Sequence, residues 1–130
     1  MERLIDPLTC KRITDKHPDY FTFNVEEWFA NADNFCLQEG DNVAFAEYKS
    51  PGVYWVHFCF DKAKGRQAID LTKKIYNTFC CLKPVKLLIG LIHVNNKKAK
   101  WLIRQVGWQS LGLIETKNGL CEMFYTKGNH

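Results

Sequence analysis

A basic loop around Lys64 is the first part of the sequence whose residue types could bind a ligand. Lys64, Gly65 and Arg66 follow an apolar segment that ends at Phe60, and a helical pattern begins near Ala68. The first N–H groups of a helix lack partners within it, and the helix dipole is positive at that end, so phosphates bind there readily. The loop therefore predicts an anion site, although one glycine is weak support and a solvated basic turn is the favoured alternative on these residues alone.

Two side chains on the segments before this loop could transfer a proton. His57 lies on the apolar segment that leads into the loop, and Glu47 lies on the segment before it. Histidine titrates near neutral pH and can accept the proton of an amine. A structural histidine packed beneath helices is an equal alternative for His57, and an exposed strand carboxylate is the favoured alternative for Glu47. His93, at the end of a later apolar run, is a weaker candidate for ligand contact.

The remaining reactive and aromatic side chains are assigned to the core. Cys59 has no flanking basic partner, and a buried cysteine usually behaves as a small hydrophobic residue. The larger aromatic residues are assigned mostly to the core, with Trp55 able to reach a partner surface; they are Trp28, Phe29, Tyr54, Trp55, Trp101 and Trp108.

Length and composition predict a single domain over residues 1–130. The chain has 130 residues, of which 46% are hydrophobic and 25% charged, and this size can bury one core without metal or disulfide staples. The longest apolar run, Val85 to Val94, is far shorter than the ~20 residues of a membrane span. The N-terminus has no signal-peptide pattern. We therefore expect a soluble, cytoplasmic protein with no membrane partner.

The six cysteines and the net charge narrow the choice of ligands. No two cysteines have Cys-x-x-Cys spacing, which predicts reduced thiols and no metal site. The formal net charge of +4 makes an anionic ligand plausible, whereas nucleic-acid binding is the least favoured class. Four basic residues on one predicted helix have solvation as their default interpretation and attraction of a phosphate or acidic partner as the alternative; they are Lys97, Lys98, Lys100 and Arg104.

Hydrophobic periodicity predicts an α/β (α+β) chain. Residues 1–23 are irregular, with room for a short strand or one helical turn, and Asn24 caps a short helix. Alternating apolar residues from 34 to 60 predict three antiparallel strands, and Ala68, Leu71, Ile75 and Phe79 form one face of a helix. A buried strand then follows over 85–94.

The last part of the chain predicts a helix and a hairpin. Asn96 caps the helix, Gly107 ends it, and strands over 111–116 and 120–126 meet at Asn118-Gly119. The strand, helix and strand between 53 and 94 predict a crossover that places two parallel strands at the centre, with ligands beyond their C-terminal ends. Alternation puts His57 and Cys59 on one face of the sheet.

The run from Asn96 to Trp108 resembles a motif of the GNAT superfamily of N-acetyltransferases. That motif has Asn, Ala three residues on, an apolar residue at six, and Gly-Phe or Gly-Trp at eleven and twelve. The family's coenzyme loop opens with a basic residue and glycine, as Lys64-Gly65 does here. The resemblance covers about residues 34–126, and the nearest likeness is to small phage-encoded GNAT-like proteins, on segments 52–57 and 64–69.

This resemblance implies a mixed, mainly antiparallel sheet with a central parallel pair and flanking helices, and a role for acetyl-CoA. A strand N–H would polarise the acetyl carbonyl, and His57 or Glu47 would accept the proton of the attacking amine. The residues carried over to the coenzyme are Phe58, Cys59 and Phe60 for the pantetheine arm, Lys64, Gly65, Arg66, Gln67, Ala68 and Ile69 for the pyrophosphate, and Asn96 beside it.

Two departures from the motif leave two hypotheses open. Gln67 and Ile69 replace the later glycines of the loop, and Ile103 replaces the tyrosine that protonates the leaving thiolate in many members. The first hypothesis is a phage-encoded N-acetyltransferase that moves an acetyl group from acetyl-CoA to an amine of a small molecule or protein. The alternative is a GNAT-fold protein that has lost coenzyme binding and acts by contact with phage structural proteins in the virion or in head assembly.

Overall fold

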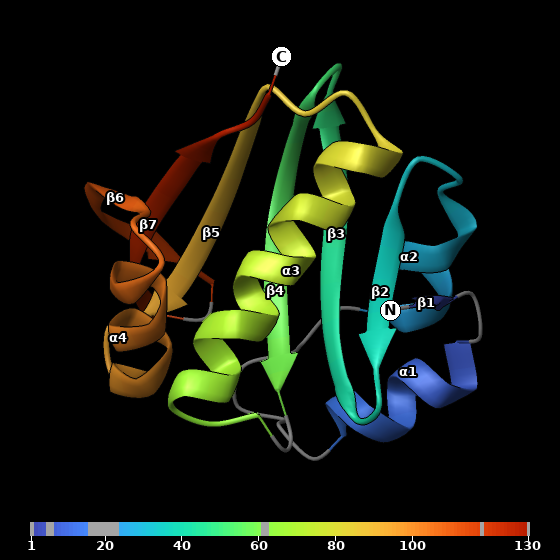
Figure 1. Cartoon of the computed structure of the whole chain (residues 1–130), viewed down its shortest axis with the longest axis horizontal. Helices are drawn as coiled ribbons and strands as arrows, with labels where there is room; N and C mark the ends of the chain where they lie inside the picture. Colours follow the sequence, from blue (N-terminus) through green and yellow to red (C-terminus); the bar gives the residue numbers. More distant parts are fainter. Residues whose placement is uncertain (1, 5–6, 16–23, 61–62, 118, 130) are drawn as a thin grey trace.

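The structure, a computed structural model, describes residues 2–4, 7–15, 24–60, 63–117 and 119–129, which form a mixed sheet with helices on both faces (Figure 1). Among these residues the sheet has seven strands in the order β1-β2-β3-β4-β5-β7-β6. The strands are β1 (Glu2–Leu4), β2 (Phe35–Glu39), β3 (Asn42–Ser50), β4 (Val53–Phe60), β5 (Leu87–His93), β6 (Gln109–Thr116) and β7 (Gly119–Lys127). The helices are α1 (Pro7–Thr14), α2 (Val25–Ala30), α3 (Arg66–Leu82) and α4 (Lys97–Gln105).

The central strands have the arrangement that the periodicity predicts. β2, β3 and β4 form an antiparallel meander, and α3 connects β4 to β5, which pairs with β4 in parallel. β6 and β7 form the predicted antiparallel hairpin, whose turn includes Asn118, outside the described residues. The mixed sheet with one parallel pair is therefore confirmed.

β4 and β5 pair only near their N-terminal ends. The ladder joins Val53–Trp55 of β4 to Leu87–Ile89 of β5. Beyond those residues β4 stays paired with β3 as far as Phe60, and β5 stays paired with β7 as far as His93. The two parallel strands consequently diverge toward their C-terminal ends, which lie at the lower end of Figure 1.

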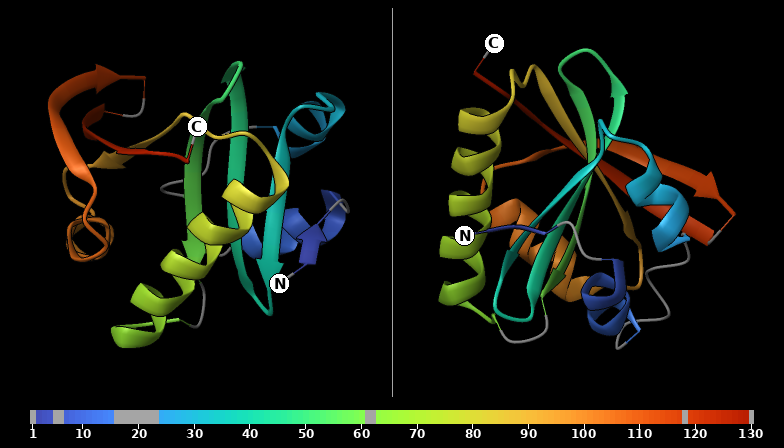
Figure 2. Two further views of the ribbon diagram at one scale, coloured as in Figure 1. Left: turned by 45° about the horizontal axis from the view of Figure 1, so that its top comes forward. Right: turned by 90° about the vertical axis from the view of Figure 1, so that its right-hand side faces the viewer.

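Helices cover the two faces of the sheet unequally. α3 and α4 lie on one face, and α1 and α2 lie on the other, toward the β2 and β3 side (Figure 2). The predicted apolar face of α3 is buried against the sheet through Ala68, Leu71, Ile75 and Phe79. On the opposite face a smaller core contains Ile13, Trp28, Cys36, Val43, Phe45 and Cys59, so Cys59 is a core residue as expected.

Both predicted asparagine caps are present. The Asn24 side chain accepts a hydrogen bond from the Glu27 N–H at 3.1 Å, and the Asn96 side chain accepts one from the Ala99 N–H at 3.2 Å. The N-terminal segment holds more regular structure than its irregular pattern indicates, because both the strand β1 and the eight-residue helix α1 form there. Residues 16–23 lie outside the described part of the chain.

Candidate active site

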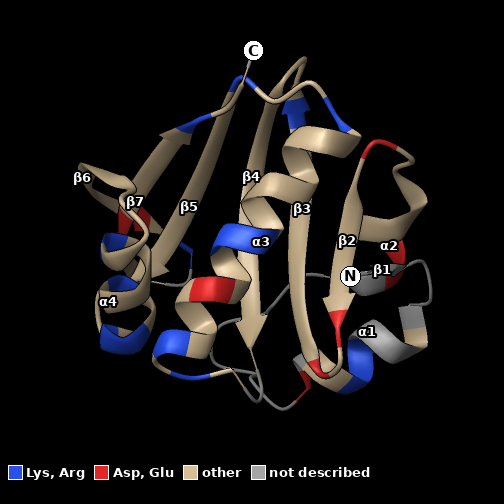
Figure 3. Ribbon diagram, in the orientation of Figure 1, with Lys and Arg blue, Asp and Glu red and all other residues tan. Residues whose placement is uncertain are grey.

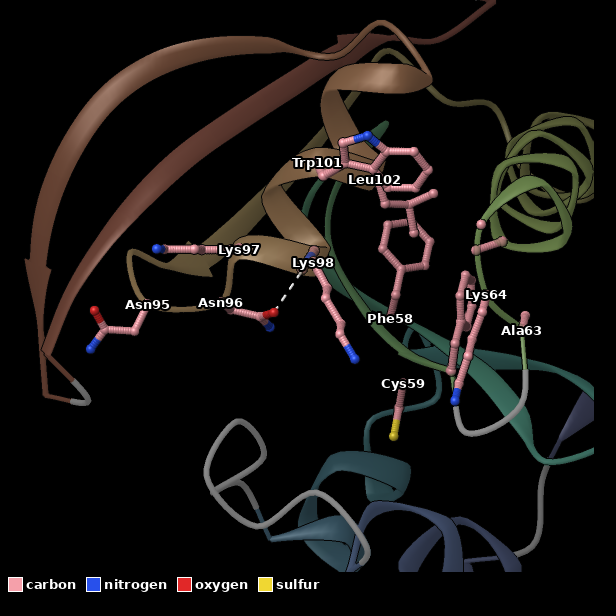
Figure 4. A pocket seen from close by; sticks show the side chains of 14 residues that line it. Phe58, Cys59, Ala63, Lys64, Asn95, Asn96, Lys97, Lys98, Trp101 and Leu102 are labelled. Carbon is pink, nitrogen blue, oxygen red and sulfur yellow. Dashed lines mark hydrogen bonds between the residues drawn. The ribbon is translucent and has the colours of Figure 1, made fainter.

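A pocket of about 860 Å³ lies beyond the end of β4, between the N-terminal turns of α3 and α4 (Figure 4). Phe58 of β4 and Leu102 of α4 give it apolar walls, and Lys64, Lys97 and Lys98 line it from the two helix starts. The full lining is Phe58, Cys59, Phe60, Ala63, Lys64, Gly65, Ala68, Asn95, Asn96, Lys97, Lys98, Ala99, Trp101 and Leu102.

Gly65 allows the chain to turn sharply from β4 into α3. Its φ of 54° and ψ of −128° lie in a region that residues with a Cβ rarely adopt, and no side chain caps the helix that follows. A Cβ at Gly65 would meet no atom within 4 Å, so the requirement for glycine comes from the backbone alone. The start of α3 thus lies at the edge of the pocket, which Lys64, Gly65 and Ala68 line.

Positive charge gathers at this end of the molecule. Figure 3 shows basic residues at the start of both α3 and α4, and the pocket lining contains no acidic side chain among the described residues. Lys64, Lys97 and Lys98 are exposed, so their attraction for an anion is long-range and is screened by salt. The arrangement suits a ligand that carries phosphate groups.

The basic face predicted on α4 divides between two roles. Lys100 and Arg104 contact Glu122 of β7, with N–O distances of 3.1 and 3.4 Å. Glu122 is buried, and hydrogen bonds from Ser110 and Lys100 lower the pKa of its carboxyl group. These two cations therefore attach α4 to the sheet, and of the four basic residues only Lys97 and Lys98 line the pocket.

A second pocket of about 190 Å³ occupies the gap between the diverging strands. Its lining includes His57 and Cys121 from one face of the sheet and Leu102 and Ile103 of α4 from the other. It shares Phe58, Asn96, Ala99 and Leu102 with the larger pocket. The gap therefore connects the space beneath α4 with the opposite face of the sheet.

His57 and Glu47 lie close together beside this gap. The His57 Nε2 is 3.9 Å from Glu47 Oε2, and Lys49 Nζ lies 2.7 Å from Glu47 Oε1. The nearby His57 and Lys49 side chains lower the pKa of Glu47 to about 2, against the desolvation that raises it. A carboxylate with so low a pKa is a weak base, whereas the His57 side chain is 25% exposed and lines the smaller pocket.

The structure brings most of the predicted coenzyme residues to one place. Seven of the ten line the larger pocket: Phe58, Cys59, Phe60, Lys64, Gly65, Ala68 and Asn96. Arg66, Gln67 and Ile69 are not in that lining, and Arg66 Nε instead lies 3.4 Å from Asp70 Oδ1. His93, the weaker candidate, lines the smaller pocket.

Trp101 is the lining residue that the sequence interpretation placed wrongly. It was expected mostly in the core, yet it is 45% exposed and lines the larger pocket. The signal was present in the helical periodicity, because Trp101 falls outside the stripe formed by Ala99, Leu102, Ile103 and Val106. The other aromatic residues that were assigned to the core are buried to different degrees. Trp28, Tyr54 and Trp108 are buried, and Phe29 and Trp55 are half-buried.

The described residues contain neither a candidate metal site nor a candidate membrane-spanning helix. No group of three His, Cys, Asp or Glu side chains among them could hold a metal ion. None of the described helices is long and apolar enough to cross a membrane.

The strand order, the parallel pair that separates and the helices on both faces define a GNAT-like α/β fold, and solved structures share it. The aminoglycoside acetyltransferase AAC(6')-Ib with acetyl-CoA is similar over 94% of this chain and 88% of its own, with a TM-score of 0.69 and 11% identity. A variant of the spermidine N-acetyltransferase SpeG from Vibrio cholerae is similar over 98% and 95%, with a TM-score of 0.71 and 10% identity.

The protein acetyltransferase RimL, which acts on ribosomal L7/L12, is also similar in its complex with coenzyme A. The match covers 95% of this chain and 89% of that one, with a TM-score of 0.69 and 8% identity. No protein-family model matches the sequence, and no curated protein matches it significantly. At these identities the likeness establishes the fold.

Proposed function

We propose that this protein is an N-acetyltransferase that uses acetyl-CoA to acetylate an amine. The observation that carries the proposal is the gap between β4 and β5, which opens into a pocket at the starts of α3 and α4. The similar solved structures are acetyltransferases, two of them containing acetyl-CoA or coenzyme A. An extended ligand with a phosphate-bearing end fits an open strand edge that leads to two helix N-termini.

In this proposal the edge of β4 beyond Trp55 pairs with the amides of the pantetheine arm. Among the described strands, the β4–β5 ladder ends at Trp55, and Val56 to Phe60 have no β5 partner in it. The backbone of Phe58, Cys59 and Phe60 holds the arm, and the turn from Lys64 to Ala68 receives the pyrophosphate. Lys64 contributes charge to the same point.

The nucleotide end lies toward α4. Trp101 presents an exposed indole, and Lys97 and Lys98 lie in the preceding turn of the same helix. An aromatic face can stack on a purine, and an ammonium group binds phosphate as a point charge. These three residues accordingly hold the adenine and the 3′-phosphate.

When bound, acetyl-CoA supplies an activated acetyl thioester in the gap. A backbone N–H of β4 donates to the acetyl oxygen and stabilises the negative charge that develops there. The His57 imidazole accepts the proton of the amine as the new C–N bond forms and the C–S bond breaks, and Glu47 positions the imidazole. Water protonates the departing thiolate, since Ile103 occupies the position of the family's tyrosine.

The placement of Gln67 and Ile69 favours this function over a protein that acts by contact alone. Neither residue lines the larger pocket, so neither side chain fills the space that a pyrophosphate needs. A phage origin is also part of the proposal, supported only by the sequence likeness of segments 52–57 and 64–69 to phage-encoded proteins. A cytoplasmic location is part of it as well, supported by the reduced-thiol pattern of the cysteines.

Calorimetric titration with acetyl-CoA tests the proposal. We expect saturable binding. The double variant Lys64→Ala/Lys98→Ala should raise the Kd at least about tenfold, which corresponds to a loss of ~1.4 kcal/mol of binding free energy. Lys73→Ala is the matched control, since Lys73 is an exposed lysine of α3 outside the pocket lining, and it should bind like the wild type. No binding heat from folded protein at millimolar coenzyme would overturn the proposal and favour the contact protein.

A further inference from the structure

The face of the sheet opposite α3 and α4 is where an acceptor would meet the thioester. α3 and α4 occupy one face, and the coenzyme pocket lies at their N-terminal turns (Figure 2, Figure 4). The smaller pocket passes between β4 and β5, with His57, Leu91, His93 and Cys121 at its other side. An amine that uses His57 as its base must therefore approach from that other side.

Strand register gathers apolar side chains around this opening. Trp55 pairs with Ile89, Ile89 with Tyr125, and Leu91 with Met123, and paired residues share a face of a sheet. Their chain neighbours Leu88 and Phe124 are buried under α3 and α4, so alternation directs the six residues of this set away from those helices. We call this set the apolar rim: Trp55, Ile89, Leu91, Ile114, Met123 and Tyr125.

The apolar rim remains accessible in the folded chain. Ile114 is 39% exposed, and the other five side chains are half-buried. Burying such a surface against an apolar molecule is favourable, and the rim is continuous with the opening beside His57. It thus suits the hydrocarbon part of an acceptor whose amine enters the gap.

Charge on the same face does not suit a polycation. Among strands β3 to β7, Glu47 is the one carboxylate on this face, and it already contacts both Lys49 and His57. Lys49 and Lys127 lie on the same face and would repel added positive charge. The carboxylates of Glu26 and Glu27 belong to α2, on the β2 side of the molecule (Figure 3).

We infer that the acceptor is a small molecule with one primary amine on an apolar, aromatic or aliphatic body. This inference rests on the proposed acetyl transfer. The amine lies beside His57 in the gap, and the apolar rim binds the body. Spermidine and aminoglycosides, the ligands named for similar structures, carry several amines and should be poor substrates here.

Methionine methyl NMR tests binding in the unmodified protein. The chain has two methionines, Met1 and Met123, so methyl labelling gives two signals, which Met123→Leu assigns. The titration is done in the presence of coenzyme A, the product that acetyl-CoA leaves after transfer. Phenethylamine should then shift the Met123 signal by the ring current of its phenyl group. Spermidine at the same concentration should leave that signal in place. A Met123 signal that phenethylamine does not move would overturn the inference.

Kinetics provide the second arm. The kcat/KM for acetylation of phenethylamine, followed by thiol release and product mass, should exceed that for spermidine at least about tenfold, as expected for burial of several methylene equivalents. Met123→Ser should remove most of that preference. Leu113→Ser is the matched control, because Leu113 is 63% exposed but pairs with Glu122 and so lies on the α4 face.

The inference and the proposed function fail in different ways. Preference for spermidine or kanamycin, an unchanged preference in Met123→Ser, or coenzyme binding without acetylation of any apolar amine would overturn the acceptor class alone. A preference for a peptide N-terminus over every small amine would overturn it too. Absence of acetyl-CoA binding by the folded wild-type protein in the calorimetric titration would overturn the proposed function itself.

Discussion

His57 and Glu47 are neighbours in space, and their contact gives them different roles. Sequence alone leaves both as candidate bases. The nearby His57 and Lys49 side chains lower the Glu47 pKa to about 2, which keeps this carboxylate ionised and poorly basic at neutral pH. In the proposed reaction, His57 therefore accepts the proton and Glu47 holds the ring in place.

Substitution of the two residues should separate these roles. His57→Gln should lower kcat by about 10²-fold or more, the usual size of general-base catalysis, with the Kd for acetyl-CoA unchanged. Glu47→Gln should cause a smaller loss, because the base itself remains. Steady-state kinetics with calorimetry measures both quantities. A larger loss of kcat in Glu47→Gln than in His57→Gln would contradict the assignment.

The same carboxylate should contribute to stability in a defined range of pH. Its pKa is about 2 in the folded protein and 4.5 in the ordinary unbonded state, so it favours the folded form fully above pH 4.5. That contribution is lost as the pH falls from 4.5 toward 2. The free energy of unfolding, measured by urea denaturation, should therefore decline more steeply over this range in wild type than in Glu47→Gln. Parallel curves would show that the contact adds no stability.

At the scale of the element, the start of α3 depends on backbone geometry more than on side chains. Gly65 has the positive φ, no side chain caps the helix, and Arg66 contacts Asp70 of its own helix. The anion site proposed here consequently depends on the turn keeping its shape.

Gly65→Ala should therefore weaken coenzyme binding as well as stability. Holding a residue with a Cβ in such a sparsely populated backbone region costs about 1–3 kcal/mol, which should appear in the free energy of unfolding. Gly40→Ala is the matched control, because Gly40 has a φ of 61° in the β2–β3 turn and also has no atom within 4 Å of its Cβ position. We expect similar destabilisation from both variants but weaker acetyl-CoA binding only in Gly65→Ala. Equal affinities would place the phosphate elsewhere.

The elements themselves follow closely from local patterns. Period-two apolar residues located β2 to β4, the Ala68 to Phe79 stripe located α3, and Asn96 located the cap of α4. The roles of Lys100 and Arg104 were not accessible in the same way. Their partner Glu122 lies on a strand beyond β6, so the pairing depends on how α4 packs on the sheet.

The gap between β4 and β5 is a property of the whole sheet, which no segment specifies alone. The crossover predicted that β4 and β5 would be parallel neighbours, as they are. Their divergence depends on each strand keeping its outer partner, β3 or β7, over its full length. The apolar rim likewise depends on registers among four strands. Residues of the site could be named from the sequence, whereas the opening between them could not.

At the scale of the molecule, the sheet is two ribbons joined edge to edge. β1 to β4 form one ribbon and β5 to β7 the other, and only three rungs of ladder connect them. Strand edges attract other strands, but this one is inside the molecule, where a second protein chain cannot easily reach it.

A thin, extended substrate can enter where a polypeptide cannot. Its amide groups would then form backbone hydrogen bonds where β4 and β5 have separated. In that state the substrate is part of the architecture and ties the two ribbons together. The product could then leave only as those hydrogen bonds break one after another. In the proposed acetyl transfer, we therefore expect release of coenzyme A from the strand edge to be a slow step.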